Sequence, residues 1–320
     1  MAQPQQRRLS RRKVLVGLIS AAGAYGFGWP EIVPNLAAAE SDGALDVAYA
    51  GSMGSVMEGP IQELVRAHFH AGWHGRPQGS TGLARLIAAR VIRPDVFVSA
   101  TASPMRIVLG AGRAQRALPI ASTEMVLAYS PHSLFASALR AATTNGHKLW
   151  WEILATPGLR FGRTDPATDP QGRNIVFTME LAQQYYRQPE LVQRILGAVI
   201  NERQIFPEPS LMARLQSGEL DAASAYKTQP EALGLPYLSL PPQINLGAAG
   251  FGRHYASVSL TLDEKTYRPE PLVFYAAALQ DAPHPDLAAR FVDWLAGAEG
   301  RAVLQRYHYD PPRVSAPLRR

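Results

Sequence analysis

The chain has 320 residues, of which 47% are hydrophobic and 18% are charged, a composition typical of a folded protein with one large or two medium domains. Residues 1–39 hold five basic side chains against one glutamate, so they account for +4 of the net charge of +6 and leave +2 for the rest. This small remainder argues against nucleic-acid binding, and the lack of cysteine excludes disulfides, thiolate metal sites, cysteine nucleophiles and a lipoprotein anchor.

Residues 1–39 have the order of a secretory signal peptide, with basic residues first, then an apolar run, then three consecutive alanines. The basic stretch around Arg11 and Arg12 resembles the twin-arginine export motif, although Val14 and Val16 replace the usual phenylalanine and lysine. We therefore predict a signal peptide read by the twin-arginine translocase and a soluble mature protein in the periplasm or another extracytoplasmic space. A Sec signal peptide and an uncleaved anchor helix are the alternatives.

From residue 44 the chain alternates short apolar runs with helical periodicity, which is typical of an α/β protein. In two places a Gly-Ser pair opens a predicted helix: Gly51-Ser52 and Gly79-Ser80. The elements predicted in this part are a strand over 45–50, a helix over 56–65, a helix over 83–91 and a strand over 95–99.

The middle of the chain, residues 150–240, follows a third strand over 124–129 and has strand, turn and helix signals of its own. It is too long for a loop, so we predict a second lobe inserted into the first. The predicted division is lobe 1 over 44–124 with about 265–320, and lobe 2 over 125–264. The last predicted elements are a strand over 272–278 and helices over 286–294 and 299–307.

Ser52 and Ser80 each stand where a helix begins. A helix N-terminus offers unpaired N–H donors and the positive end of the helix dipole, so it suits an anion. The hydroxyl of a serine at this position can join those donors. The alternative is that each serine only caps its helix, a role for which serine is strongly preferred.

An ordered set of short blocks resembles the archaeal-type tungstate/molybdate-binding proteins of ABC importers, over about residues 44–313. The blocks are Tyr-Ala-Gly-Ser at 49–52, Gly-Ser at 79–80, Asp-Val-Phe-Val-Ser-Ala at 95–100, Glu-Met-Val-Leu-Ala-Tyr at 124–129, Trp-Glu-Ile-Leu at 151–154, Asp-Pro-Gln-Gly-Arg at 169–173 and Leu-Pro-Pro-Gln-Ile-Asn-Leu-Gly at 240–247. The resemblance implies a two-lobed periplasmic binding protein of type II that closes on its anion between the lobes. It further implies a monomer without enzymatic activity or cofactor, which captures molybdate or tungstate and delivers it to the permease and ATPase subunits of an importer.

The resemblance also implies which residues bind the oxyanion. They are Ser52, Ser80, Asp169, Gln216 and Tyr226. Gln216 departs from the family, which has a glutamate in the corresponding turn, so only Asp169 could contact the molybdenum or tungsten centre directly. We therefore expect a tetrahedral anion held by donors in place of a six-coordinate one. The other interpretation of Asp169 is that it only shapes the Asp-Pro turn.

Three further interpretations remain open. The ligand could be another oxyanion such as sulfate, or the chain could be a two-lobed ligand sensor without a transporter. An exported enzyme using Asp165 and Asp169 as an acid/base pair is the third, although nothing in the sequence supplies the apolar setting that such a pair needs. His68, His70 and His74 lack the spacing of a metal site and are interpreted as surface residues.

Overall fold

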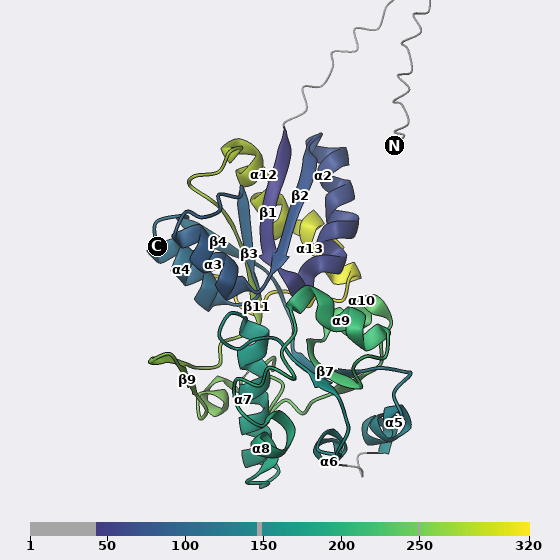
Figure 1. Ribbon diagram of the computed structural model, residues 1–320. Coiled ribbons are helices and arrows are strands. Elements are labelled where there is room, and N and C mark those ends of the chain that lie inside the picture. Colours follow the sequence, from purple (N-terminus) through teal and green to yellow (C-terminus); the bar gives the residue numbers. More distant parts are fainter. Residues whose placement is uncertain (1–42, 146–148, 249) are drawn as a thin grey trace, which may run out of the picture. The chain divides into compact units, whose positions relative to one another are not determined.

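The computed structural model describes residues 43–145, 149–248 and 250–320 (Figure 1). The predicted signal peptide, with Arg11 and Arg12, lies outside the described residues. Within the described part of the chain, every helix is too short or too polar to span a bilayer.

The first sheet has six strands in the order β12-β4-β11-β3-β1-β2 (Figure 1). Its strands are β1 (Ala44–Ala50), β2 (Gly72–Gln78), β3 (Val96–Ser99), β4 (Arg116–Ser122), β11 (Val273–Ala278) and β12 (Leu318–Arg319). β1 pairs in parallel with β2 and β3, whereas β11 lies antiparallel between β3 and β4. The last part of the chain is thereby built into the middle of a sheet that the first part begins.

Helices cover both faces of this sheet. Successive side chains of β1 point to opposite faces, and the apolar ones on each face must be buried. Leu45, Val47 and Tyr49 pack in one core with α2 (Gln62–Phe69), α12 (Pro285–Ala296) and α13 (Ala298–Arg306). Ala48 points the other way, into a core with α3 (Ser80–Ala88) and α4 (Ala102–Gly110). The buried strands are apolar on both sides, as expected for strands whose sheet is covered by helices on both faces.

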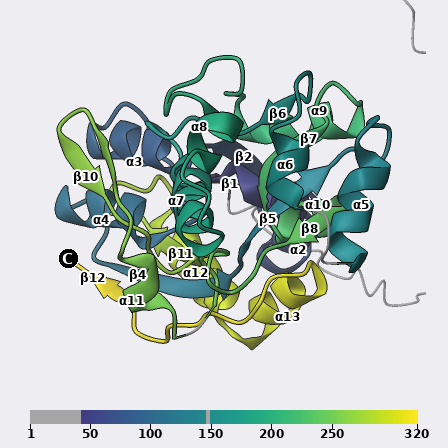
Figure 2. The same cartoon turned by 90° about the horizontal axis from the view of Figure 1, so that it is seen from below.

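The second sheet has four strands in the order β6-β7-β5-β8. Its strands are β5 (Met125–Tyr129), β6 (Phe161–Gly162), β7 (Ala222–Tyr226) and β8 (Tyr237–Ser239). The helices of this region are α5 (Ala136–Asn145), α6 (Trp150–Leu154), α7 (Pro170–Tyr185), α8 (Leu191–Leu196), α9 (Glu208–Gln216), α10 (Thr228–Leu233) and α11 (Gly252–Tyr255). α7 contacts β5 and β7 (Figure 2), and it also contacts β9 (Leu260–Leu262), which pairs with β10 (Lys265–Tyr267) as a hairpin.

The chain passes from the first sheet to the second between β4 and β5, and returns between β10 and β11. Two sheets with helices packed on them confirm the predicted α/β class and the two-lobed fold. We propose the same lobe division as before, residues 44–124 with about 265–320 and residues 125–264, as the working division of the chain.

The helices that follow β1 and β2 differ from those predicted. The segment after β1 starts at once as a 3-10 turn, η1 (Gly51–Met53), continues as α1 (Gly54–Val56) and widens into a π-helical turn, η2 (Met57–Ile61), before α2. Pro60 lies inside η2, where its missing N–H prevents a regular α-helical hydrogen bond. α3 ends at Ala88, earlier than predicted, because Arg90 adopts a left-handed backbone with φ of 59°.

One glycine of α7 is required by packing. A Cβ on Gly172 would lie 2.5 Å from the carbonyl oxygen of Thr164 and 2.7 Å from the nitrogen of Pro166, both backbone atoms. We expect Gly172→Ala to lower the free energy of unfolding by about 1–3 kcal/mol in urea denaturation, since the start of α7 must move away from this loop. Gly110→Ala, at the end of α4 with no atom within 4 Å of the new methyl, is the control and should leave stability equal or higher. An equal effect of both changes would contradict the packing argument.

Candidate functional site

Three segments that begin helices meet where elements of the two sheets touch: η1 after β1, α3 after β2, and α7. The backbone N–H of Gly82 in α3 donates to the carbonyl of Thr168, just before α7, at 3.0 Å. Gly79 approaches α7 so closely that a Cβ there would lie 3.2 Å from Cβ of Asp169. Three helix starts, whose N–H groups and dipoles favour negative charge, therefore lie close together around one point.

Asp169 is the residue that begins α7. Its extended backbone, with φ of −127°, precedes Pro170, whose fixed φ suits the first helical position. Asp169 Oδ1 accepts a hydrogen bond from the N–H of Gln171 at 2.9 Å, whereas Oδ2 is buried without a hydrogen bond of normal geometry. One oxygen of Asp169 thus shapes the start of α7, as the turn interpretation expects, and the second oxygen has no such bond.

Glu208, the first residue of α9, reaches the start of η1 with its carboxylate. Glu208 Oε2 accepts from the N–H of Gly51 at 2.9 Å and Oε1 from the N–H of Ser52 at 2.8 Å. The side chain is buried, although the two partners are more than 150 residues away along the chain. A carboxylate therefore already occupies two of the donors that would suit an anion.

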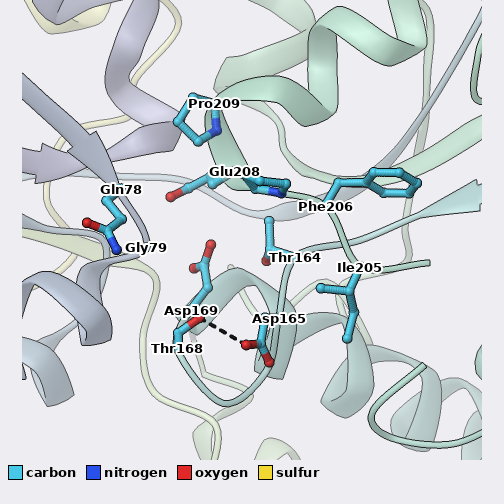
Figure 3. Close-up of a pocket in the computed structure, with 11 residues that line it drawn as sticks. Gln78, Gly79, Thr164, Asp165, Thr168, Asp169, Ile205, Phe206, Glu208 and Pro209 are labelled. Atoms are coloured by element: carbon cyan, nitrogen blue, oxygen red, sulfur yellow. Dashed lines mark hydrogen bonds between the residues drawn. The ribbon is translucent and has the colours of Figure 1, made fainter. Parts of the chain in front are cut away.

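Asp169 and Glu208 form one buried acidic pair. Both line a pocket of about 270 Å³ that also includes Gln78 and Thr164 (Figure 3). Burial raises the pKa of Asp169 to about 6, against the N–H of Gln171 and the charge of Arg173, which act to lower it. Burial and then the charge of Asp169 raise the pKa of Glu208 well above its ordinary value. Burial and the neighbouring negative charge therefore favour the protonated form of these carboxyls.

Tyr226, at the end of β7, provides a hydroxyl to the same place. Its side chain is fully buried, and its oxygen accepts a hydrogen bond from Nδ2 of Asn174 at 3.1 Å. Burial, followed by the charges of Asp169 and Glu208, raises the pKa of Tyr226 well above its ordinary value. The phenol therefore keeps its proton and can donate it to an anion.

The two serines differ in their contacts. Ser52 is 6% exposed, and its hydroxyl lies beside the Glu208 carboxylate without a hydrogen bond of normal geometry to any described residue. Ser80 is fully buried as the first residue of α3, and its oxygen accepts from the N–H of Ala100 at 3.2 Å. Neither side chain caps its own helix, which weakens the interpretation of these serines as simple caps.

Arg163 aligns the two segments that carry the carboxylates. Its guanidinium is buried and donates to Oε1 of Gln204 at 3.1 Å and to the carbonyl of Val199 at 2.8 Å. Its backbone pairs with the segment that leads to Glu208, since the N–H of Phe206 donates to the carbonyl of Arg163 at 3.0 Å. Burial lowers the pKa of Arg163 to about 10. The hydrogen bonds of its guanidinium hold the backbone of Arg163 beside the segment that leads to Glu208.

Gln216 does not join the acidic pair. It is exposed at the last position of α9, eight positions after Glu208, which corresponds to about 12 Å along a helix. It lines a second pocket of about 310 Å³ that also includes Ser52 and Glu208 but not Asp169. The structure therefore places Ser52 beside Glu208, and Tyr226 close enough to feel the charges of Asp169 and Glu208. Ser80 follows Gly79, which lies against Asp169. A carboxylate, Glu208, stands where the sequence argument expected an amide.

The expectation of a tetrahedral anion rested on Gln216 and loses its premise, because a second buried carboxylate faces Asp169. Sequence analysis missed Glu208. The only local signal was its position between two prolines, which mark a helix start with an acidic first turn.

The histidines and Asp165 have other roles. His68 and His70 lie on α2 and at its end, and His74 on β2 lies 3.6 Å from Asp46. Among the described residues, no group of three or more His, Cys, Asp or Glu side chains could hold a metal ion. Asp165 shapes the turn before α7, where it accepts from the N–H of Ala167 at 2.8 Å.

A buried set of donors between two α/β sheets is the arrangement that a two-lobed solute-binding protein presents to its ligand. The chain belongs to the bacterial extracellular solute-binding protein family, which it matches over residues 45–310. It is 28% identical over 302 residues to the molybdate/tungstate-binding protein WtpA of Thermococcus kodakarensis, covering 86% of this chain and 84% of that protein. It is 30% identical over 273 residues to a putative ABC transporter molybdenum-binding protein of Haloferax volcanii, covering 83% and 78%.

Solved structures show the same fold at lower identity. The periplasmic molybdate-binding protein of Azotobacter vinelandii superposes with a TM-score of 0.59 at 17% identity, covering 84% of this chain and 100% of that one. The sulfate-binding protein SubI of Mycobacterium tuberculosis superposes with a TM-score of 0.53 at 13% identity, covering 84% and 86%. The family is thus one of binding proteins, and the fold alone is shared by molybdate and sulfate binders.

The acidic pair predicts how stability depends on pH. Because the pKa of Asp169 is about 6 in the folded chain and 3.8 is its ordinary value, the folded state binds more protons between these limits. The free energy of unfolding should therefore fall as pH rises from about 4 to about 6, by on the order of 3 kcal/mol, and Glu208 adds a change of the same sign. Urea unfolding in buffers free of sulfate and phosphate, at a series of pH values, measures this.

Asp169→Asn should flatten this pH dependence, because an amide does not titrate. Asp286→Asn changes an exposed carboxyl at the start of α12 and should keep the wild-type profile. A wild-type protein whose stability rises steadily from pH 4 to pH 6 would show that the two carboxyls are ionised and favourably paired in the folded state.

Proposed function

We propose that this chain is an extracytoplasmic binding protein that captures molybdate or tungstate and delivers it to the permease and ATPase of an ABC importer. The observation that carries the proposal is the buried pair of Asp169 and Glu208 beside the donors at the start of η1. The named functions of the relatives from Thermococcus kodakarensis and Haloferax volcanii support it.

The acidic pair restricts which oxyanion fits. A carboxylate beside a dianion is repelled, unless its oxygen bonds to the central atom and expands the coordination of that atom. Molybdenum and tungsten accept additional oxygen ligands in this way, whereas the sulfur of sulfate does not. Asp169 and Glu208 then serve as two such ligands, and the bound ion is six-coordinate.

The donors complete the site. Ser52 and Ser80 contribute hydroxyls from the starts of η1 and α3, and Tyr226 contributes its phenol from the end of β7 in the second sheet. Hydrogen bonds to a charged group are the strong ones, and burial removes the competing water. An anion bound here is contacted by elements of both lobes. Binding therefore favours the closed arrangement, in which the two lobes are in contact.

The rest of the proposal concerns the place and state of the chain. Residues 1–39, with Arg11 and Arg12, are a signal peptide that directs the chain through the twin-arginine translocase to the periplasm. The mature protein acts as a monomer, has no enzymatic activity and needs no cofactor. Its family of extracellular solute-binding proteins supports a location outside the cytoplasm.

The selectivity of the site tests this function directly. We expect wild type to bind tungstate and molybdate far more tightly than sulfate in calorimetric titrations at fixed pH. Asp169→Asn and Glu208→Gln should each weaken tungstate binding at least about tenfold, since each removes one ligand of the metal centre, and should reduce the preference over sulfate. Circular dichroism confirms that the variants are folded.

Gln216→Ala is the matched control, because it alters the residue that the family resemblance suggested without changing the acidic pair. It should leave both affinities unchanged. A loss with Gln216→Ala as large as the loss with Glu208→Gln would return Gln216 to the site, and a wild type that prefers sulfate would reject molybdate or tungstate as the ligand.

A further inference from the structure

Arg173 is a buried cation that joins elements of the two sheets. It lies on the first turn of α7 and is 4% exposed. Its Nη1 donates to the carbonyl of Pro166 at 2.8 Å, and its Nη2 donates to Oγ1 of Thr81 at 2.7 Å. The guanidinium also lies over the ring of Tyr267, 4.5 Å from the centroid.

Two of these contacts hold Arg173 beside α7, and the third crosses to α3. Pro166 belongs to the loop before α7, and Tyr267 belongs to the β9–β10 hairpin that packs on α7, so both hold the guanidinium beside α7. Thr81 is the second residue of α3, which packs on the first sheet. The bond between Arg173 and Thr81 therefore exists only while α3 and α7 are together.

The crossing bond is a strong one, because its donor is charged and little water reaches the guanidinium while α3 and α7 are together. Burial lowers the pKa of Arg173 while the charge of Asp169 opposes this, so the cation lies in the field of Asp169. Separation of α3 from α7 must break this bond together with the bond between Gly82 and Thr168.

We propose that Arg173 is a latch whose hydrogen bond to Thr81 holds α3 against α7 and thereby slows release of the bound anion. Arg173 is a positioning residue here, since it acts on release through α3 and not by bonding to the anion's central atom. The part that concerns release rests on the proposed function, whereas the part that concerns contact between the two helices does not.

A latch of this kind has a kinetic signature. It acts after the elements have come together, so its loss should accelerate dissociation and leave association nearly unchanged. A residue that only stabilised α7 would instead lower stability and affinity whether or not Thr81 was present.

The first experiment needs no anion. The chain lacks cysteine, so Ala67→Cys on α2 and Gln193→Cys on α8, both exposed, give one pair of spin labels across the two halves. Double electron–electron resonance then measures the distribution of distances between the two labels, and hence the fraction of molecules in which α3 and α7 are together. Thr81→Val and Arg173→Lys should each reduce this fraction. Thr81→Ser, which keeps the hydroxyl, should leave the fraction at the wild-type value.

The second experiment measures release of tungstate by stopped flow. Thr81→Val and Arg173→Lys should each accelerate release about tenfold, which is the effect of losing one charge-assisted hydrogen bond. The double variant should be no faster than the faster single variant, because both changes remove the same bond. Thr178→Val removes a buried hydroxyl elsewhere on α7 and should release tungstate at the wild-type rate.

The outcomes separate the two proposals. A wild type that binds no tungstate rejects the proposed function, and the label distances still decide whether Arg173 and Thr81 hold the helices together. Unchanged distances in Thr81→Val and Arg173→Lys overturn the latch. So does a double variant whose effect on release is the product of the single effects, because the two residues would then act independently.

Discussion

The arrangement of the site depends on two hydrogen bonds, which the backbone N–H groups of Gly51 and Ser52 donate to the carboxylate of Glu208. This pair of bonds joins the start of η1, which follows β1 next to the edge of the first sheet, to the start of α9 on the second sheet. An isolated buried carboxylate would be costly, and two such N–H donors are what lowers that cost. Asp169 adds a second carboxyl at the same point, so the fold brings together acidic groups that repel unless protons or a metal centre lie between them.

This arrangement explains why the surrounding elements take the form they do. Gly79 and Gly172 have no side chain where backbone or Asp169 approaches closely, so α3 and α7 can begin within contact of one another. Arg163 aligns the segments that lead to the two carboxyls, and Arg173 supplies the positive charge beside them. In the proposed function, binding and closure are one event, because the groups proposed to contact the anion are the groups that join the two halves.

Much of the fold follows from sequence, because apolar alternation and helix starts are local. β1, β3 and β11 were predicted within one or two residues, but β2 was missed, since Gly72–Gln78 is a polar edge strand with little apolar surface to reveal it. The antiparallel insertion of β11 was also missed, because strand order depends on distant pairing. At the site, Asp169 and the serines stand at helix starts that sequence can indicate. Glu208 could not be found, because its partners lie more than 150 residues away.

The central claim is that two carboxyls bind the metal centre of the captured oxyanion. X-ray absorption at the tungsten edge, on protein saturated with tungstate and washed free of excess, reports the number and distances of the oxygen neighbours. We expect an expanded, six-coordinate tungsten centre, in which the two tungsten–oxygen distances to Asp169 and Glu208 are longer than the rest. A four-coordinate ion with equal tungsten–oxygen distances would contradict it, and would mean that the anion is held by hydrogen-bond donors alone.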